Sequence, residues 1–214
     1  MIAIIDYQMG NLRSVEKAFL KVGGDATVTS DKNKIRRAKK VVLPGVGAFG
    51  DGMKELRKAS FAEVIKDSIK EGKPFFGVCL GMQLLFEKSE EAPGVNGLGI
   101  LEGAVKKFRF PKRYTLNAIR YKVPHMGWNQ LRVKGQGLRV KENILNSIDD
   151  GVYVYFVHSY YCAPKDKNII TATTDYGINF ASMIQKNNIY GCQFHPEKSQ
   201  DAGLKILEKF VKLC

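Results

Sequence analysis

A cysteine between two glycines, at the junction of a strand-like run and an apolar run, most constrains the fold. Residues 75–78 read as a buried strand, and Gly77-Val78-Cys79-Leu80-Gly81 leads into a predicted apolar helix over 80–86. A sharp strand-to-helix turn leaves little room beside its central residue, so glycine is needed on both sides. The helix N-terminus favours a thiolate, and the amide of Leu80 is free to donate to a developing oxyanion. The alternative is a buried cysteine in a glycine-rich turn.

The first half of the chain alternates strand and helix signals, and the second half is richer in strands. Ser60 and Glu63 match a capping box before a helix, and Asn187-Asn188 indicates a hairpin. The pattern predicts an α/β fold, doubly wound, with a mostly parallel sheet and antiparallel β additions, in a single domain over 1–214. Strands are predicted at 2–6, 25–29, 41–43, 75–78, 104–110, 153–158, 169–174, 181–185 and 189–194, with helices near 12–22, 60–71 and 207–211.

His195 and Glu197 follow the last predicted strand, separated by Pro196. A cysteine nucleophile needs a base, and the base needs an orienting acceptor. Residues i and i+2 of an extended chain project to the same side, so Glu197 can lie behind the imidazole of His195. A lone histidine is more often structural, but its combination with Cys79 favours catalysis. The 44–47 loop, Pro-Gly-Val-Gly, suits backbone amides that face an anion, although alone it reads as a plain βα turn.

Charge is concentrated in one segment. The 214 residues carry a formal net charge of +13, and segment 103–141 holds 11 Lys or Arg and no Asp or Glu. The rest of the chain has 23 basic and 21 acidic residues. Such a segment fits either nucleic-acid binding or a basic surface that steers a partner. Four cysteines without metal-ligand spacing, no signal peptide and no apolar run of membrane-spanning length predict a cytoplasmic protein.

Several blocks along nearly the whole chain resemble class I (triad) glutamine amidotransferases, in particular the glutaminase subunits of imidazole glycerol phosphate synthase. The resemblance departs from the family at Gln8, where a glycine is usual. The blocks are Pro44 to Phe49, Cys79 to Phe86, Pro124 to Asn129, Phe156 to Tyr160 and Gln193 to Ser199.

The resemblance implies that L-glutamine is hydrolysed to glutamate and ammonia by the catalytic residues Cys79, His195 and Glu197. It also implies that the ammonia passes to a cyclase subunit in a heterodimer, which forms imidazole glycerol phosphate and aminoimidazole carboxamide ribotide for histidine biosynthesis. The lone subunit would be nearly inactive. No cofactor, metal, nucleic acid or membrane is implied. The implied oxyanion and substrate residues are Gly45, Val46, Gly47, Leu80, Gln83, Ser159 and Tyr160, and the implied partner-interface residues are Asn11, Trp128, Tyr155 and Lys198.

Three alternatives remain at this point. An amidotransferase of another pathway shares the triad motifs, and a cysteine protease or esterase shares the turn around Cys79. A basic nucleic-acid-binding module would explain segment 103–141 but leaves the triad unexplained. His158 is interpreted as structural, and Cys162, Cys192 and Cys214 as inert. We expect the basic segment to face an acidic partner surface or solvent beside it.

Overall fold

The computed structural model describes residues 1–110, 121–134, 144–146 and 148–213. Its centre is an eight-stranded sheet in the order β2-β1-β3-β4-β13-β12-β11-β8. The five strands from β2 to β13 run parallel, and β12, β11 and β8 add antiparallel pairs. The predicted sheet is therefore confirmed. The sheet strands are β1 Ile2–Ile5, β2 Ala26–Thr29, β3 Lys40–Leu43, β4 Phe75–Val78, β8 Arg132–Val133, β11 Ile170–Asp175, β12 Asn179–Lys186 and β13 Ile189–Cys192.

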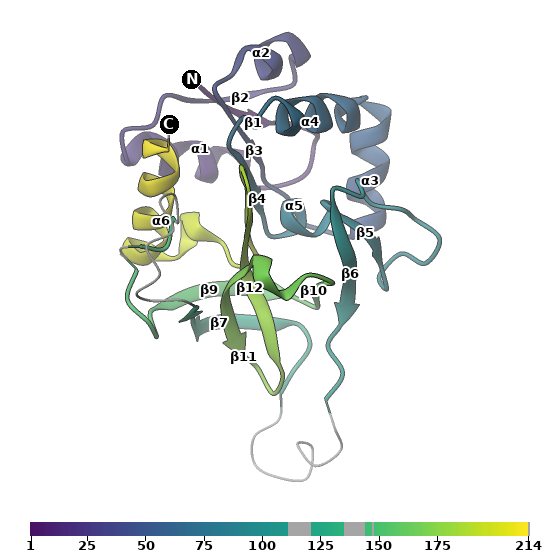
Figure 1. The fold of residues 1–214 in the computed structure, drawn as a ribbon, viewed down its shortest axis with the longest axis vertical. Helices are drawn as coiled ribbons and strands as arrows, with labels where there is room; N and C mark the ends of the chain where they lie inside the picture. The colour runs from purple at the N-terminus through teal and green to yellow at the C-terminus, as the bar shows by residue number, and fades with distance from the viewer. Residues whose placement is uncertain (111–120, 135–143, 147, 214) are drawn as a thin grey trace.

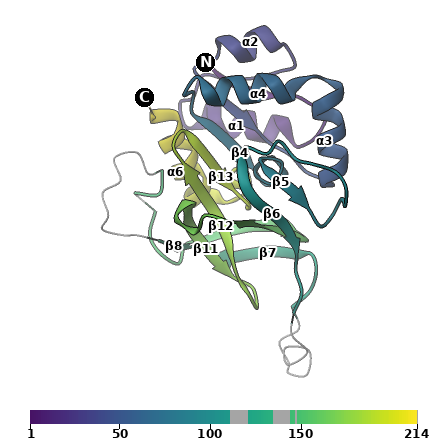
Figure 2. The same ribbon diagram turned by 45° about the vertical axis from the view of Figure 1, so that its right-hand side comes forward.

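Helices cover both faces of this sheet because its parallel strands are buried on both sides (Figures 1 and 2). Phe19 and Phe210 contribute to the core on one face, and Leu56 and Ile65 to the core on the other. The first face carries α1 Leu12–Lys21 and α6 Gln200–Lys212, and the second carries α2 Lys32–Arg37, α3 Phe49–Lys58 and α4 Phe61–Lys70.

Two smaller sheets flank the carboxyl ends of the parallel strands. One has the order β10-β6-β5, and the other is the antiparallel ribbon β7-β9, in which Trp128 pairs with Tyr155. Short 3₁₀ helices span Lys167–Ile169 and Pro196–Lys198. In the described part of the chain, no helix combines the length and the apolar character that a membrane crossing requires. The flanking strands are β5 Phe86–Ser89, β6 Leu101–Lys107, β7 His125–Gln130, β9 Tyr153–His158 and β10 Tyr160–Pro164.

Two local predictions are wrong. The helix after Cys79 is only α5 Leu80–Gln83, because the carbonyls of Leu84 and Leu85 accept hydrogen bonds from the chain at 98–101 instead of continuing the helix. The capping box at Ser60 does not form. Ser60 has a φ of 53° in the tight link between α3 and α4, and its side chain makes no capping bond. The Asn187-Asn188 hairpin between β12 and β13 is confirmed.

Candidate active site

The candidate site lies at the carboxyl ends of four neighbouring strands of the sheet. Strands β1, β3, β4 and β13 are adjacent and parallel, so their carboxyl ends meet at one edge. Tyr7, the 44–47 loop, Cys79 and His195 follow these strands, in that spatial order. Ligands of open α/β sheets bind outside this edge. Residues up to 188 positions apart in the chain thus come together because of the strand order alone.

The turn at Cys79 is strained and tightly enclosed. Cys79 has a φ of 53° and a ψ of −111°, a conformation that side chains rarely adopt. A Cβ on Gly81 would lie 1.8 Å from the carbonyl oxygen of Leu43, and one on Gly77 would lie 2.8 Å from the amide of Met82. Only glycine fits at both places, so the surrounding backbone fixes the direction of the thiol.

His195 and Glu197 form a buried pair. The Nδ1 atom of His195 lies 2.9 Å from Oε1 of Glu197, and the two side chains are 4% and 2% exposed. Burial lowers the pKa of His195, but Cys79 and Glu197 together outweigh burial and raise it to about 10. The backbone amide of His195 donates to the carbonyl of Tyr155 at 2.9 Å, which ties this turn to β9. The imidazole is therefore held in orientation and favoured as a cation.

A chain of amide side chains runs beneath the thiol. Nε2 of Gln193 donates to the Cys79 sulfur at 3.7 Å, and Oε1 of Gln193 accepts from Nε2 of Gln83 at 3.0 Å. The same Gln83 nitrogen donates to the carbonyl of Tyr160 at 3.1 Å. Sequence reasoning assigned no role to Gln193, although it precedes His195 by two residues and so projects to the same side of the chain.

Two histidines extend this chain to β7. Nδ1 of His158 lies 2.8 Å from the carbonyl of Tyr160 and must donate to it, because a carbonyl only accepts. Nε2 of His158 then accepts from Nδ1 of His125 at 2.9 Å, and Nε2 of His125 accepts from Nδ2 of Asn129 at 3.2 Å. Burial lowers the pKa of His125 to about 4 and that of His158 to about 3. Both rings are neutral, and their tautomers are fixed by these bonds.

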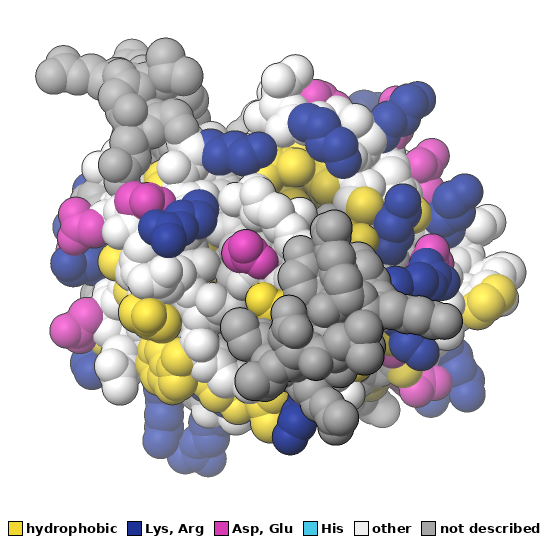
Figure 3. All heavy atoms as spheres, turned by 90° about the horizontal axis from the view of Figure 1, so that it is seen from below, with side chains coloured by type: hydrophobic (Ala, Val, Ile, Leu, Met, Phe, Trp, Pro, Cys, Tyr) yellow, Lys and Arg dark blue, Asp and Glu magenta, His cyan; other side chains and the backbone are white. Residues whose placement is uncertain are grey.

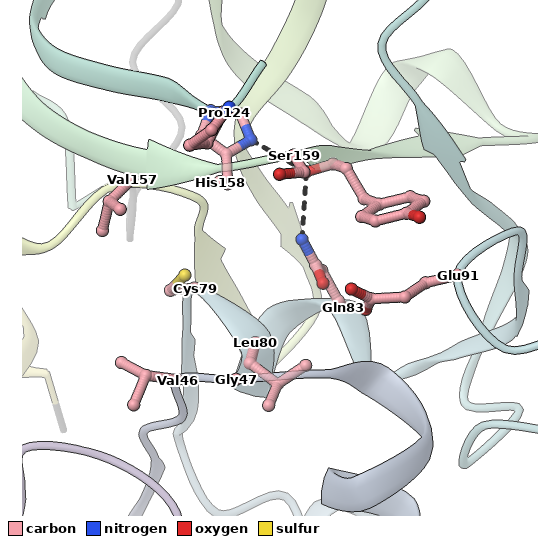
Figure 4. Close-up of a pocket in the computed structure, with 11 residues that line it drawn as sticks. Val46, Gly47, Cys79, Leu80, Gln83, Glu91, Pro124, Val157, His158 and Ser159 are labelled. Carbon is pink, nitrogen blue, oxygen red and sulfur yellow. Dashed lines mark hydrogen bonds between the residues drawn. The ribbon is translucent and has the colours of Figure 1, made fainter.

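A cavity of about 300 Å³ opens in front of the thiol, at the lower end of the range for small-molecule sites. The Cys79 sulfur points into the space between Val46 of the 44–47 loop and Val157 of β9 (Figure 4). Six of the seven predicted oxyanion and substrate residues line this cavity, all except Gly45. His158, which was expected to be only structural, also lines it. The residues that line the cavity are Val46, Gly47, Cys79, Leu80, Gln83, Glu91, Pro124, Val157, His158, Ser159 and Tyr160.

The amide of Leu80 is not free, contrary to the sequence expectation. It donates to the carbonyl of Gly45 at 3.3 Å, so the 44–47 loop occupies the amide that an oxyanion would need. Gly45 itself is buried, while Val46 and Gly47 are exposed. In this arrangement the loop supplies a carbonyl, rather than an amide, to the start of α5.

Three of the four predicted interface residues lie together. The rings of Trp128 and Tyr155 are 6.0 Å apart, and Nζ of Lys198 lies 5.8 Å from the centre of the Tyr155 ring. Trp128 is 46% exposed and Met126 on the same strand is 61% exposed, so this ribbon presents apolar surface to solvent. Asn11 is exposed at the start of α1, whose residues Ser14 and Lys17 line a hollow together with Lys198.

The basic segment is interleaved with acidic residues from elsewhere in the fold. Arg109 pairs with Glu90 at 2.9 Å, and Arg132 pairs with Asp150 at 3.3 Å. On the face seen from below Figure 1, blue and magenta side chains both occur among the described residues (Figure 3). At least two cations of the segment are therefore paired with carboxylates from other parts of the chain. Lys112, Arg113, Arg120, Arg139 and Lys141 lie outside the described residues.

Among the described residues, the remaining cysteines and Gln8 lie outside the lining of the cavity. Cys162 and Cys192 are free and buried, and burial raises the pKa of each thiol. Cys214 lies outside the described residues. Within those residues, no group of three His, Cys, Asp or Glu side chains could hold a metal ion. Gln8 adopts a φ of 67°, so it takes the left-handed conformation for which glycine is better suited.

Comparison with known proteins places the chain among glutamine amidotransferases. Residues 3–214 match the family described as glutamine amidotransferase class-I. The imidazole glycerol phosphate synthase subunit HisH of Geobacter sulfurreducens is 51% identical over 212 residues, covering 99% of this chain and 98% of the relative. The HisH subunit of Caldanaerobacter subterraneus subsp. tengcongensis is 50% identical over 213 residues, with 100% and 98% covered.

Solved structures show the same fold at low sequence identity. A crystal structure of a glutamine amidotransferase has a TM-score of 0.73 at 18% identity and covers 100% of both chains. The structure of PurLQS from Thermotoga maritima has a TM-score of 0.71 at 18% identity, covering 98% of this chain and 96% of that one. These likenesses agree with the predicted fold class.

Proposed function

The chain belongs to the class-I glutamine amidotransferases and, within them, to the HisH subunits of imidazole glycerol phosphate synthase, and we propose that Cys79, His195 and Glu197 are its glutaminase triad. The observation that carries this proposal is the convergence of the three residues at adjacent strand ends, with the thiol facing a cavity of about 300 Å³. The reaction is the hydrolysis of L-glutamine to glutamate and ammonia.

In this proposal Cys79 attacks the side-chain amide carbon of glutamine and forms a thioester. His195 donates its proton to the departing ammonia and then takes one from the attacking water. Its pKa of about 10 supports the acid role, because the ring is charged when the leaving group needs a proton. Glu197 holds Nδ1 at 2.9 Å and so aims the other ring nitrogen at the reaction.

Glutamine binding is assigned to the far end of the cavity. Gln83, Ser159 and Tyr160 line it there, and we propose that they receive the amino-acid part of the substrate. The Gln83 side chain is fixed by its bonds to Tyr160 and Gln193, so it is pre-oriented before glutamine arrives. Gln193 bonds both Gln83 and Cys79, and it therefore couples substrate binding to the position of the thiol.

The oxyanion of the tetrahedral intermediate would be held by the amide of Leu80 and by an amide of the 44–47 loop, which includes Gly45, Val46 and Gly47. The bond from Leu80 to the Gly45 carbonyl must open before this can happen. The lone chain is accordingly a poor glutaminase, and its activity depends on a change in the loop.

We also propose that the chain is one cytoplasmic domain that forms a heterodimer with a cyclase subunit, to which the ammonia passes. Trp128, Tyr155 and Lys198 form the centre of the proposed interface, with Asn11 at its edge. Large aromatic side chains that remain exposed in a monomer are typical of such surfaces.

The test replaces Cys79 with alanine in the complex with the cyclase. We expect glutamine-dependent turnover to disappear, while turnover supported by added ammonia stays within twofold of the wild type. Purified wild-type chain alone should show little glutaminase activity. Product formation from glutamine and from ammonium salts is measured in parallel.

Cys162→Ala is the matched control, because it removes another buried thiol away from the cavity lining. It should retain glutamine-dependent turnover. Persistent glutamine use by Cys79→Ala would contradict the assignment of the nucleophile, and full activity of the lone chain would contradict the dependence on the loop.

A further inference from the structure

A buried hydroxyl lies beneath the 44–47 loop without a role in the triad. Tyr7 follows β1 and is 1% exposed, and among the described residues its hydroxyl has no hydrogen-bond partner. A Cβ built on Gly45 would lie only 2.3 Å from this hydroxyl, 3.0 Å from Cβ of Leu80 and 3.2 Å from the amide of Gly81. The Tyr7 hydroxyl therefore lies against Gly45, and Gly45 itself packs against the start of α5.

An unpartnered buried hydroxyl is expensive. Burial of a polar group without a hydrogen bond costs about 1–3 kcal/mol, and phenylalanine would fill the same space without that cost. Burial raises the pKa of Tyr7, and the nearby Cys79 raises it further, so the hydroxyl keeps its proton at neutral pH. Tyr7 is thus a donor that is maintained at this place without an acceptor.

The residue against this hydroxyl is Gly45, whose backbone carbonyl is a hydrogen-bond acceptor. That carbonyl now accepts from the amide of Leu80 at 3.3 Å, which is long for an N–H···O bond. If the carbonyl turned to the Tyr7 hydroxyl, the Leu80 amide would be released toward the cavity. Because the C=O and N–H of a trans peptide point in opposite directions, the same rotation would turn the amide of Val46 the other way.

We propose that Tyr7 is a positioning residue of the glutaminase site, whose hydroxyl takes over the Gly45 carbonyl when the loop becomes productive and so frees the Leu80 amide for the oxyanion. This inference rests on the proposed function and adds a residue to it. This arrangement requires glycine at position 45, since any side chain there would collide with the Tyr7 hydroxyl.

The test is Tyr7→Phe in the complex with the cyclase. We expect kcat for glutamine hydrolysis to fall about tenfold, which corresponds to about 1.4 kcal/mol, while KM for glutamine stays within twofold. The melting temperature should not fall, because the removed hydroxyl has no partner in the resting state. A hydroxyl with only a structural role would leave kcat unchanged.

A second readout separates the oxyanion from the thiol. Iodoacetamide alkylates Cys79 by direct displacement of iodide, without an oxyanion, so its rate should be the same in Tyr7→Phe and in the wild type. Mass spectrometry of the Cys79 peptide follows this reaction. Tyr190→Phe, which alters another buried tyrosine of the same sheet, is the control and should retain wild-type kcat.

A kcat within twofold of the wild type in Tyr7→Phe would overturn the inference. A parallel loss of alkylation would also overturn it, because Tyr7 would then act on the thiol and not on the loop. Failure of the proposed function is a different result: the wild-type complex would not use glutamine, or Cys79→Ala would still use it.

Discussion

The two walls of the cavity are built very differently. On one wall a continuous run of hydrogen bonds extends from Asn129 through His125, His158 and the Gln83–Gln193 pair to the sulfur of Cys79. The opposite wall is the 44–47 loop, whose bond to the start of α5 is one contact of 3.3 Å, and whose Val46 and Gly47 are exposed.

This difference separates two tasks. Bond making requires a nucleophile and a base in fixed geometry. The hydrogen-bonded wall holds the Cys79 thiol, and Glu197 holds the base His195 beside it. Stabilisation of the oxyanion requires backbone amides that the loop does not yet present. A loosely held loop beside the proposed triad would allow activity to be controlled without disturbing the nucleophile, since only the loop would have to change.

Neutralising Glu197, which orients the base beside the hydrogen-bonded wall, should have the largest effect on activity. In Glu197→Gln the side chain retains its shape, but the buried cation of His195 loses its carboxylate partner. We expect kcat/KM for glutamine in the complex to fall about ten thousandfold, in line with losses seen when the acid of a triad is neutralised.

Ammonia-dependent turnover of the same variant is its internal control and should be unchanged. If glutamine-dependent turnover fell by less than tenfold, Glu197 would not be needed to charge or orient His195, and the fixed wall would be less important than the contacts indicate.

Stability should differ between the two walls. Gly81→Ala places a methyl group 1.8 Å from the Leu43 carbonyl, so backbone must move, and we expect a loss of at least about 3 kcal/mol in the free energy of unfolding. Gly47→Ala strains a φ of 101° but meets only the flexible end of Met9 at 3.0 Å, so about 1–2 kcal/mol should be lost.

Denaturant unfolding of the two glycine variants compares them directly. Equal losses would mean that the loop is as constrained as the turn at Cys79, which would remove the contrast between the walls.

The effect of pH at ordinary values is the most gradual of those predicted, because it develops only as the solution becomes acidic. The pKa values of His125 and His158 lie near 4 and 3, below the unfolded value of 6.5, so the unfolded chain binds protons first as pH falls. The stability that comes from these neutral rings is present above pH 6.5 and is lost as pH falls toward 4 and 3, by at most about 2 kcal/mol for each ring at pH 5.

Denaturant unfolding at a series of pH values from 7 to 5 measures how steeply the free energy of unfolding falls with pH. His125→Phe removes one of the two titrating rings, and about half of the slope should disappear, whatever its effect at pH 7. If the pH dependence of the free energy of unfolding were unchanged, His125 and His158 would not be the cause of the loss of stability in acid.

Sequence patterns predict helices and strands best where a local run of apolar or turn residues indicates the same structure that the fold adopts. The β4 run 75–78 and the hairpin at 187–188 are found as predicted, because apolar runs and turn residues indicate them locally. The apolar run 80–86 predicts a helix, yet such a run fits a buried helix or a strand equally well. Its helix ends at Gln83 because β5 pairs with β6, a contact that no local signal carries.

The sequence by itself determined which residues we propose as the triad and the strand that precedes its cysteine, because glycines around Cys79 and the His195-Pro196-Glu197 spacing constrain the backbone locally. Only the tertiary structure decided the rest. The order β1-β3-β4-β13 brings Tyr7, Gly45, Cys79 and His195 to one edge. The occupied amide of Leu80 and the unpartnered hydroxyl of Tyr7 depend on contacts between segments dozens of residues apart. Packing across the sheet sets those contacts, and neither composition nor periodicity predicts them.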